Sequence, residues 1–266
     1  MAPPIPSPPA VRALVIAAAF GTTLLLVASG CAYQETAPPR PYLKESPAAK
    51  ASKPARKAPV PDGVHALTDA QARSALISEA DLGEPWMPTQ GVATWRDGFL
   101  KASTGTPDCR RLLDALYADD LLGAPARAAI GLDDNYADGQ LRYQVTSRAP
   151  AEVDRALAWL RKLPRGECAK FVATGPGGER RTVTVSDVPL PEAGDARQGL
   201  RVEVTRELDG EPVTLTLEVA AVRVGDDALT ITNGGLGEIL TESTQAAAEL
   251  GAERLAQVRK QGRAQI

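Results

Sequence analysis

Alternating apolar and polar residues predict a run of β-strands in the second half of the chain. The alternation is found at residues 141–145, 183–185, 200–204, 213–219, 222–224 and 229–231. The apolar positions shift by one residue after Val219, which predicts a β-bulge near Ala220-Ala221. Short glycine turns such as Asp209-Gly210 separate the stretches and are typical of antiparallel hairpins. Since each stretch also has a polar face, we expect a sheet that is covered on one side only.

Apolar residues at helical spacing predict helices at residues 69–78, 107–116, 150–163 and 241–259. Thr68 and Gln71 form a capping box at the first of these, and Pro107 suits the first turn of the second. The last helix has small residues on its apolar face, including Gly251, which indicates close packing on a flat surface such as a sheet. Together the elements predict one α+β domain at residues 67–266, in which an antiparallel sheet is flanked by helices.

The first 30 residues have the pattern of an export signal, with Arg12 before an apolar stretch at residues 13–27. That stretch is shorter than the roughly 20 residues that a membrane-spanning helix needs. Small residues then lead to Cys31, in an order that resembles a bacterial lipobox, although Ala28 stands where an aliphatic residue is more usual. The resemblance implies cleavage before Cys31 and lipidation of its thiol. An ordinary cleaved signal peptide and an uncleaved single-span anchor are the alternatives.

Residues 31–66 have no hydrophobic periodicity and many prolines, so we expect a disordered tether that begins at the lipidated Cys31. Six basic and three acidic residues make this segment net positive, whereas residues 67–266 carry 23 basic and 30 acidic residues. A basic tether favours anionic lipid headgroups, unless its charge serves solubility alone. The acidic domain is repelled by nucleic acid, and we expect no nucleic-acid partner.

The two remaining cysteines, Cys109 and Cys168, are expected to form a disulfide in an oxidising compartment. Two buried free thiols and a metal-binding pair are the alternatives. A metal site needs more ligands, and the only histidine of the chain, His65, lies in the tether. A domain without histidine has neither Ser-His-Asp nor Cys-His catalysis. We therefore expect a non-enzymatic protein with no catalytic residue, no metal and no cofactor.

Several local motifs have a catalytic or binding interpretation that is weaker than a structural one. Ser103, beside Lys101, is better explained by a polar loop than by a Ser/Lys nucleophile. Residues 133–139 resemble a calcium loop, but the liganding positions are out of register and a hairpin is favoured. Gly175–Gly178 precedes a strand, whereas a phosphate loop precedes a helix. The paired acids Asp119-Asp120 are interpreted as solvated, and a carboxylate-based hydrolase remains a lesser alternative.

Trp86 and Trp95 are the candidate binding residues, because aromatic residues make up only 4% of the chain and these two lie near irregular segments. Flat amphipathic rings in such segments are common in binding clefts. The alternative is that both rings cover the core beside the first helix.

The order of these motifs resembles the PknH-like extracellular sensor domains of actinobacterial surface proteins, some of which are fused to Ser/Thr kinases while many are free lipoproteins. The residues that carry the resemblance are the lipobox, the Pro-rich tether, Leu76-Ile77, Pro107-Asp108-Cys109, Trp159, Gly166–Cys168 and Val222–Gly225. The resemblance implies a curved antiparallel sheet flanked by helices, with a cleft for an unidentified ligand. This chain departs from the kinase-linked members, since it has one cysteine pair where they have two, and it has no kinase.

These observations predict a lipoprotein on the extracytoplasmic face of a cell membrane, held by a palmitate-bearing lipid anchor and carrying a ligand-binding or sensing domain. The expected partners are the membrane, through the anchor, and a cell-envelope ligand or protein. A structural or adaptor lipoprotein that binds another envelope protein is the alternative.

We predict that Cys31→Ala releases the protein or leaves an unlipidated precursor. Two acyl chains bind a bilayer stably, whereas the tether has no apolar face of its own. Detergent partitioning of the wild type and the variant measures this effect, and equal membrane retention of both would contradict the lipid anchor.

Overall fold

The computed structural model of the protein describes residues 66–264. The predicted signal peptide, the lipidation site Cys31 and the tether as far as His65 lie outside the described residues. The domain boundaries predicted for these segments therefore stay predictions.

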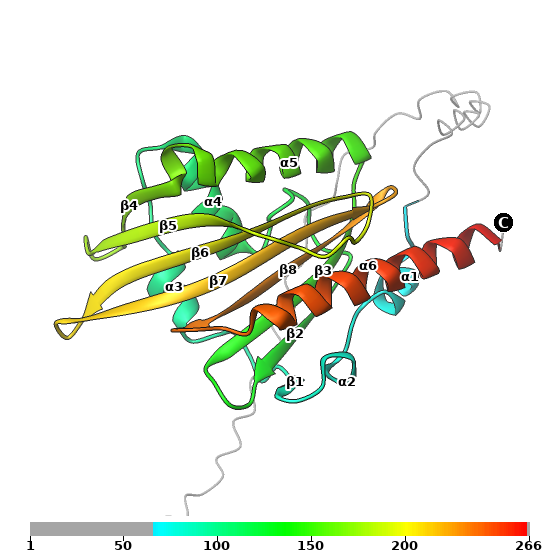
Figure 1. The fold of residues 1–266 in the computed structure, drawn as a ribbon, viewed down its shortest axis with the longest axis horizontal. Helices are drawn as coiled ribbons and strands as arrows, with labels where there is room; N and C mark the ends of the chain where they lie inside the picture. Colours follow the sequence, from blue (N-terminus) through cyan, green and yellow to red (C-terminus); the bar gives the residue numbers. More distant parts are fainter. Residues whose placement is uncertain (1–65, 265–266) are drawn as a thin grey trace, which may run out of the picture. The chain divides into compact units, whose positions relative to one another are not determined.

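The described residues form an α+β domain built on one open, antiparallel sheet, which confirms the predicted fold class (Figure 1). The strand order across the sheet is β1-β2-β3-β8-β7-β6-β5-β4. The strands are β1 (Trp86–Pro88), β2 (Ala128–Asp134), β3 (Gly139–Ser147), β4 (Lys170–Thr174), β5 (Arg180–Val188), β6 (Ala196–Leu208), β7 (Glu211–Val224) and β8 (Asp227–Leu236).

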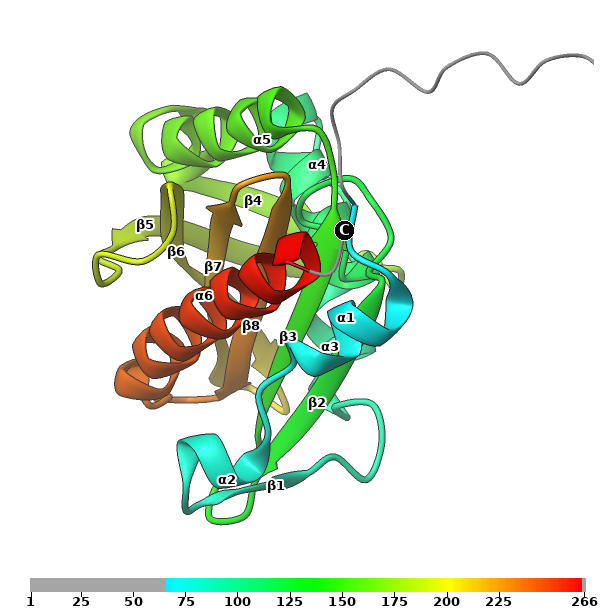
Figure 2. The same cartoon turned by 90° about the vertical axis from the view of Figure 1, so that its right-hand side faces the viewer.

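Helices pack on both faces of this sheet (Figure 2). They are α1 (Asp69–Ser74), α2 (Glu79–Leu82), α3 (Trp95–Leu100), α4 (Pro107–Ala118), α5 (Pro150–Lys162) and α6 (Thr241–Ala264), with short 3₁₀ turns η1 (Leu163–Arg165) and η2 (Glu167–Ala169). Within residues 66–264, no helix is both long and apolar enough to cross a membrane.

The expected bulge at Ala220-Ala221 is wrong, because β7 pairs with β6 and with β8 in an uninterrupted register through both residues. The apolar positions shift because the strand is covered on both faces. Val219 and Ala221 lie in the core under α3, α4 and α5, whereas Ala220 and Val222 lie in the core under α1 and α6. The expectation of a sheet covered on one side only is wrong for the same reason.

The predicted helices are present, with shifts at their ends. The capping box of Thr68 and Gln71 opens α1, but the helix ends at Ser74, before Ser78. The apolar stripe of α4 is buried as expected, and α6 extends beyond Arg259 to Ala264. The boundaries of α1 and α6 are therefore the parts that sequence periodicity misplaced.

The structure contains the predicted disulfide between Cys109 and Cys168. Both side chains are buried in the core under α4 and α5. The bond joins α4 to η2, at the start of the outermost hairpin β4–β5.

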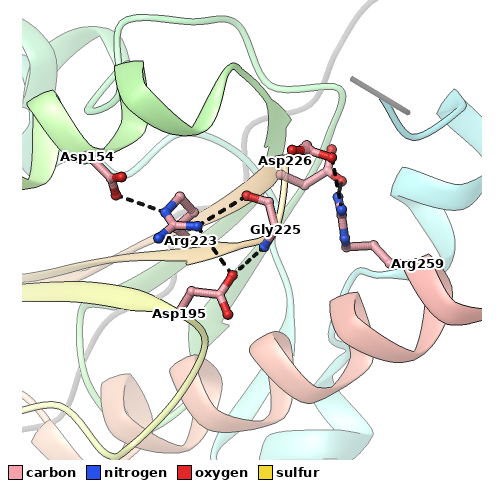
Figure 3. A network of polar contacts seen from close by, with 7 residues as sticks. Asp154, Asp195, Arg223, Gly225, Asp226 and Arg259 are labelled. Carbon is pink, nitrogen blue, oxygen red and sulfur yellow. Dashed lines mark hydrogen bonds and ion pairs between the residues drawn. The ribbon is translucent and has the colours of Figure 1, made fainter. Parts of the chain in front are cut away.

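Ion pairs at the β7–β8 turn connect this turn to the helices on both faces of the sheet (Figure 3). Arg223 donates to Asp154 of α5 at 2.8 Å and to Asp195 of the β5–β6 loop at 3.3 Å. Arg259 of α6 pairs with Asp226 at 3.2 Å and also with the buried Asp227. The turn thereby fixes α5 and α6 at the same end of the sheet.

Helix α6 lies close to the sheet because it presents small residues to it. A Cβ atom at Gly251 would lie 2.6 Å from the Cε2 and the hydroxyl oxygen of Tyr143 on β3. The Tyr143 hydroxyl donates to the Ala75 carbonyl oxygen at 3.2 Å, and burial raises the pKa of Tyr143 above its ordinary value. Gly251 therefore sets the distance between α6 and the sheet.

We predict that Gly251→Ala lowers the free energy of unfolding by about 1–3 kcal/mol, because the added methyl group overlaps a fixed ring. Gly98→Ala is the matched control, since a Cβ atom in this other helix meets only Arg206 at 3.4 Å. The control should be neutral or stabilising by up to about 1 kcal/mol. Urea denaturation of both variants measures the difference, and equal stabilities would contradict the close packing of α6.

Candidate functional site

A cavity of about 360 Å³ lies at one end of the sheet, where four segments meet. The segments are the start of β1, the β2–β3 hairpin, the end of β8 and the residues that precede α6. Figure 2 shows β1 and α2 at the same end of the sheet as the β2–β3 hairpin. The lining residues are Pro85, Trp86, Asp134, Tyr136, Ala137, Asp138, Gly139, Asn233, Gly235, Leu236, Glu238, Ile239 and Leu240.

The segment that precedes α6 forms one wall of this cavity, and Asn233 of β8 holds this segment and the first turn of α6 in place. The Asn233 amide nitrogen donates to the Leu240 carbonyl oxygen at 3.0 Å and to the Thr244 hydroxyl at 3.1 Å. A carbonyl oxygen only accepts, so these bonds define which end of the amide is the nitrogen. Asn233 is buried, and the two bonds satisfy its donors.

Glu218 of β7 fixes the same helix start from the neighbouring strand, since it lies directly opposite Asn233 in the ladder. Its buried carboxylate accepts from Arg201 at 2.7 Å and from the Thr241 hydroxyl at 2.8 Å. A carboxylate beside a helix N-terminus is stabilised by the helix dipole. The contacts of Asn233 and Glu218 therefore hold residues 240–244 on the sheet.

The segment from α2 to β1 forms the opposite wall and is attached to α6. The Trp86 indole nitrogen donates to the Ser243 hydroxyl at 3.1 Å. Arg254 forms two bonds with Asp81, at 2.9 and 2.6 Å, and a third with the Leu76 carbonyl oxygen at 2.7 Å. The position of the Trp86 ring in the cavity thus depends on α6.

The β2–β3 hairpin closes the end of the cavity, as the hairpin interpretation of residues 133–139 predicts. Asp134 accepts from the backbone nitrogens of Tyr136 at 2.8 Å and Ala137 at 3.1 Å, which shapes the turn. The Tyr136 side chain is 75% exposed, and its hydroxyl donates to Glu84 at 3.3 Å. The aromatic ring therefore stands at the mouth of the cavity and not in the core.

The cavity combines apolar walls with an acidic mouth. Leu236 and Leu240 are 40% and 47% exposed, so apolar surface remains open to solvent beside the buried Trp86 ring. The charged lining residues are the three acids Asp134, Asp138 and Glu238, and the lining includes no basic side chain. Apolar walls with a few polar groups are typical of small-molecule sites.

The structure separates the two tryptophans that the sequence singled out. Trp86 lines the cavity, whereas Trp95 begins α3 and is buried in the core under α4 and α5. Sequence reasoning missed the wall formed by Leu236, Ile239 and Leu240, because these residues follow no periodic pattern.

The other motifs that were considered have structural roles. Ser103 forms an isolated backbone bridge with Thr174 at the edge of the sheet. Asp119 is partly buried and pairs with Arg96 at 2.9 Å and with Arg142 at 3.0 Å. The expectation that Asp119 is a solvated acid is therefore wrong. Across residues 66–264, no group of three or more His, Cys, Asp or Glu side chains is arranged to hold a metal ion.

No protein-family model matches the sequence, and no curated protein matches it. Among solved structures, the fold is similar to the extracellular domain of PknH from Mycobacterium tuberculosis, with 15% sequence identity and a TM-score of 0.43. The match covers 74% of this chain and 100% of that domain. A likeness at this level does not identify a ligand, and the chemistry of the cavity follows from the residues of this chain.

We predict that acid weakens the attachment of the segment from α2 to β1. The hydrogen bonds from Arg254 hold the pKa of Asp81 well below its ordinary value of 3.8. A carboxyl group with a lowered folded-state pKa contributes stability above its unfolded pKa and loses it as the pH falls. Asp81→Asn should therefore cost about 1–2 kcal/mol at neutral pH and flatten the loss of stability below about pH 4.

Glu79→Gln is the matched control for this prediction, because Glu79 lies in the same short helix and forms no ion pair with any described residue. Urea denaturation as a function of pH gives the stabilities, and hydrogen exchange at residues 79–88 reports the local effect. The same pH dependence in Asp81→Asn and in the wild type would contradict the role of this pair.

Proposed function

We propose that the protein binds a small apolar ligand in the cavity between the β2–β3 hairpin and the start of α6. The observation that carries the proposal is the cavity itself, about 360 Å³ in volume and walled by Trp86, Leu236, Ile239 and Leu240. Transfer of apolar ligand surface from water to such walls is favourable by roughly 25 cal/mol per Å² before the costs of association. The role is binding and not catalysis.

The walls of the cavity are held in place without a ligand, which supports its role as a binding site. Each wall is held by hydrogen bonds within the protein, through Asn233 for the start of α6, Ser243 for Trp86 and Asp134 for the hairpin. A preformed site loses little conformational entropy when a ligand enters. The exposed Tyr136, Leu236 and Leu240 then cover a ligand from the solvent side.

We also propose that this domain works outside the cytoplasm as a lipid-anchored, PknH-like sensing module. The lipobox-like residues before Cys31, the Pro-rich tether and the motif order support the proposal. The disulfide between Cys109 and Cys168 agrees with an oxidising compartment.

We predict that the full chain binds the neutral apolar dye N-phenylnaphthylamine, with increased fluorescence on entry into the cavity. Leu236→Ser and Leu240→Ser should each weaken binding about three- to tenfold, because each removes apolar contact surface of the order of 1–2 kcal/mol. Both leucines are partly exposed, and their replacement should change stability little.

Leu208→Ser is the matched control, since Leu208 is 37% exposed on β6 and does not line the cavity. Its dye affinity should equal that of the wild type. If the wild type does not bind the dye, or if all three variants bind it equally well, the cavity is not the binding site.

A further inference from the structure

We propose that the ligand of this cavity is a small amphipathic cation, which has an apolar body and a protonated amine. The inference rests on the proposed function and adds the charge and hydrogen-bonding character of the ligand. It follows from which donors and acceptors the walls leave free.

The side-chain donors of the cavity are already in use. The Trp86 indole nitrogen donates to Ser243, and the Tyr136 hydroxyl donates to Glu84. Both amide hydrogens of Asn233 are directed at Leu240 and Thr244. The lining contains no lysine or arginine. An anionic ligand would therefore find no free side-chain donor among the lining residues.

The side-chain acceptors of the cavity, unlike its donors, are free to bind a ligand. Among residues 66–264, no hydrogen bond is donated to the amide oxygen of Asn233, although this side chain is only 2% exposed and lines the cavity. This oxygen is not among the fully buried polar atoms that lack a partner, so it keeps accessible surface and can accept a hydrogen bond from a ligand N–H group. This amide oxygen is the polar group best placed to define the orientation of a bound donor.

The carboxylates at the mouth are also free. Asp138 and Glu238 are exposed and form no ion pair with any residue that the structure describes. They lie on two different segments, the β2–β3 hairpin and the loop before α6, and both border the same cavity. A cation at the mouth would thus be attracted from two sides. Trp86 and Tyr136 also line the cavity, and aromatic rings attract cations through their faces.

The start of α6 is the one feature that would favour an anion, because a helix N-terminus carries partial positive charge. In this fold the buried carboxylate of Glu218 already lies against Thr241, and Glu242 occupies the first turn. Glu218 is itself paired with Arg201, so Glu242 is the acid that offsets the helix dipole. The net field at the cavity therefore comes from the carboxylates at its mouth.

Three ligands with the same apolar body test this inference, namely phenylbutylamine, phenylbutanol and phenylbutyrate. Isothermal titration calorimetry on the full chain at neutral pH and low salt should show that the amine binds about three- to tenfold more tightly than the alcohol. The carboxylate should bind more weakly than the alcohol. Added salt should reduce the preference for the amine, because the acids at the mouth are exposed.

The double variant Asp138→Asn/Glu238→Gln should bind the amine and the alcohol with equal affinity. Glu249→Gln/Glu253→Gln removes the same charge from the exposed side of α6, away from the cavity, and should keep the preference. Equal binding of all three ligands by the wild type would overturn the cationic ligand while leaving the apolar site intact. A preference for the carboxylate, or no binding of the amine, would also overturn it.

Discussion

The cavity depends on two buried polar side chains, Glu218 and Asn233, which face each other on the central strands β7 and β8. A buried carboxylate or amide without partners costs several kcal/mol, and here the partners are Thr241, Leu240 and Thr244 at the start of α6. The helix therefore begins at one place on the sheet. Since Trp86 is bonded to Ser243 of the same turn, the opposite wall of the cavity is positioned by the same helix.

The division of the domain into two cores explains why the cavity lies where it does. Strand β7 supplies Val219 and Ala221 to the core under α4 and α5, and Ala220 and Val222 to the core under α6. Beyond Ala220 toward the start of the strand, the α6 face of β7 changes from apolar to polar at Glu218. The apolar core ends at this point, and the cavity forms between its end and the hairpin.

Much of the local structure could be predicted from the sequence, because capping residues, helical stripes and glycine turns act over a few positions. The capping box at Thr68, the stripe of α4 and the hairpin at residues 133–139 are examples. The burial of both sheet faces could not be predicted in this way. Alternation shows which residues of one strand share a face, but strand pairing decides whether the apolar faces of two strands lie on the same side.

Some residues of the candidate site could also be predicted from the sequence, and others could not. Trp86 was found because aromatic residues are scarce in this chain, but the same reasoning selected Trp95, which is buried elsewhere. Asn233 could have been found from the alternation, because it is the polar residue that follows Leu229 and Ile231 on the inward-facing side of the strand. Glu218 had none, because it occupies a position that alternation assigns to solvent. Its burial results from the contact with α6, which is distant in sequence.

The most direct measurement of the central claim uses the three tryptophans of the chain as reporters. Fluorine NMR of the 5-fluorotryptophan-labelled protein gives one signal each for Trp86, Trp95 and Trp159, assigned by single replacement with phenylalanine. Titration with an apolar ligand should shift the Trp86 signal and leave the other two in place, because only Trp86 lines the cavity. A shift of Trp95 or Trp159 while Trp86 stays unchanged would place the ligand elsewhere and contradict the account.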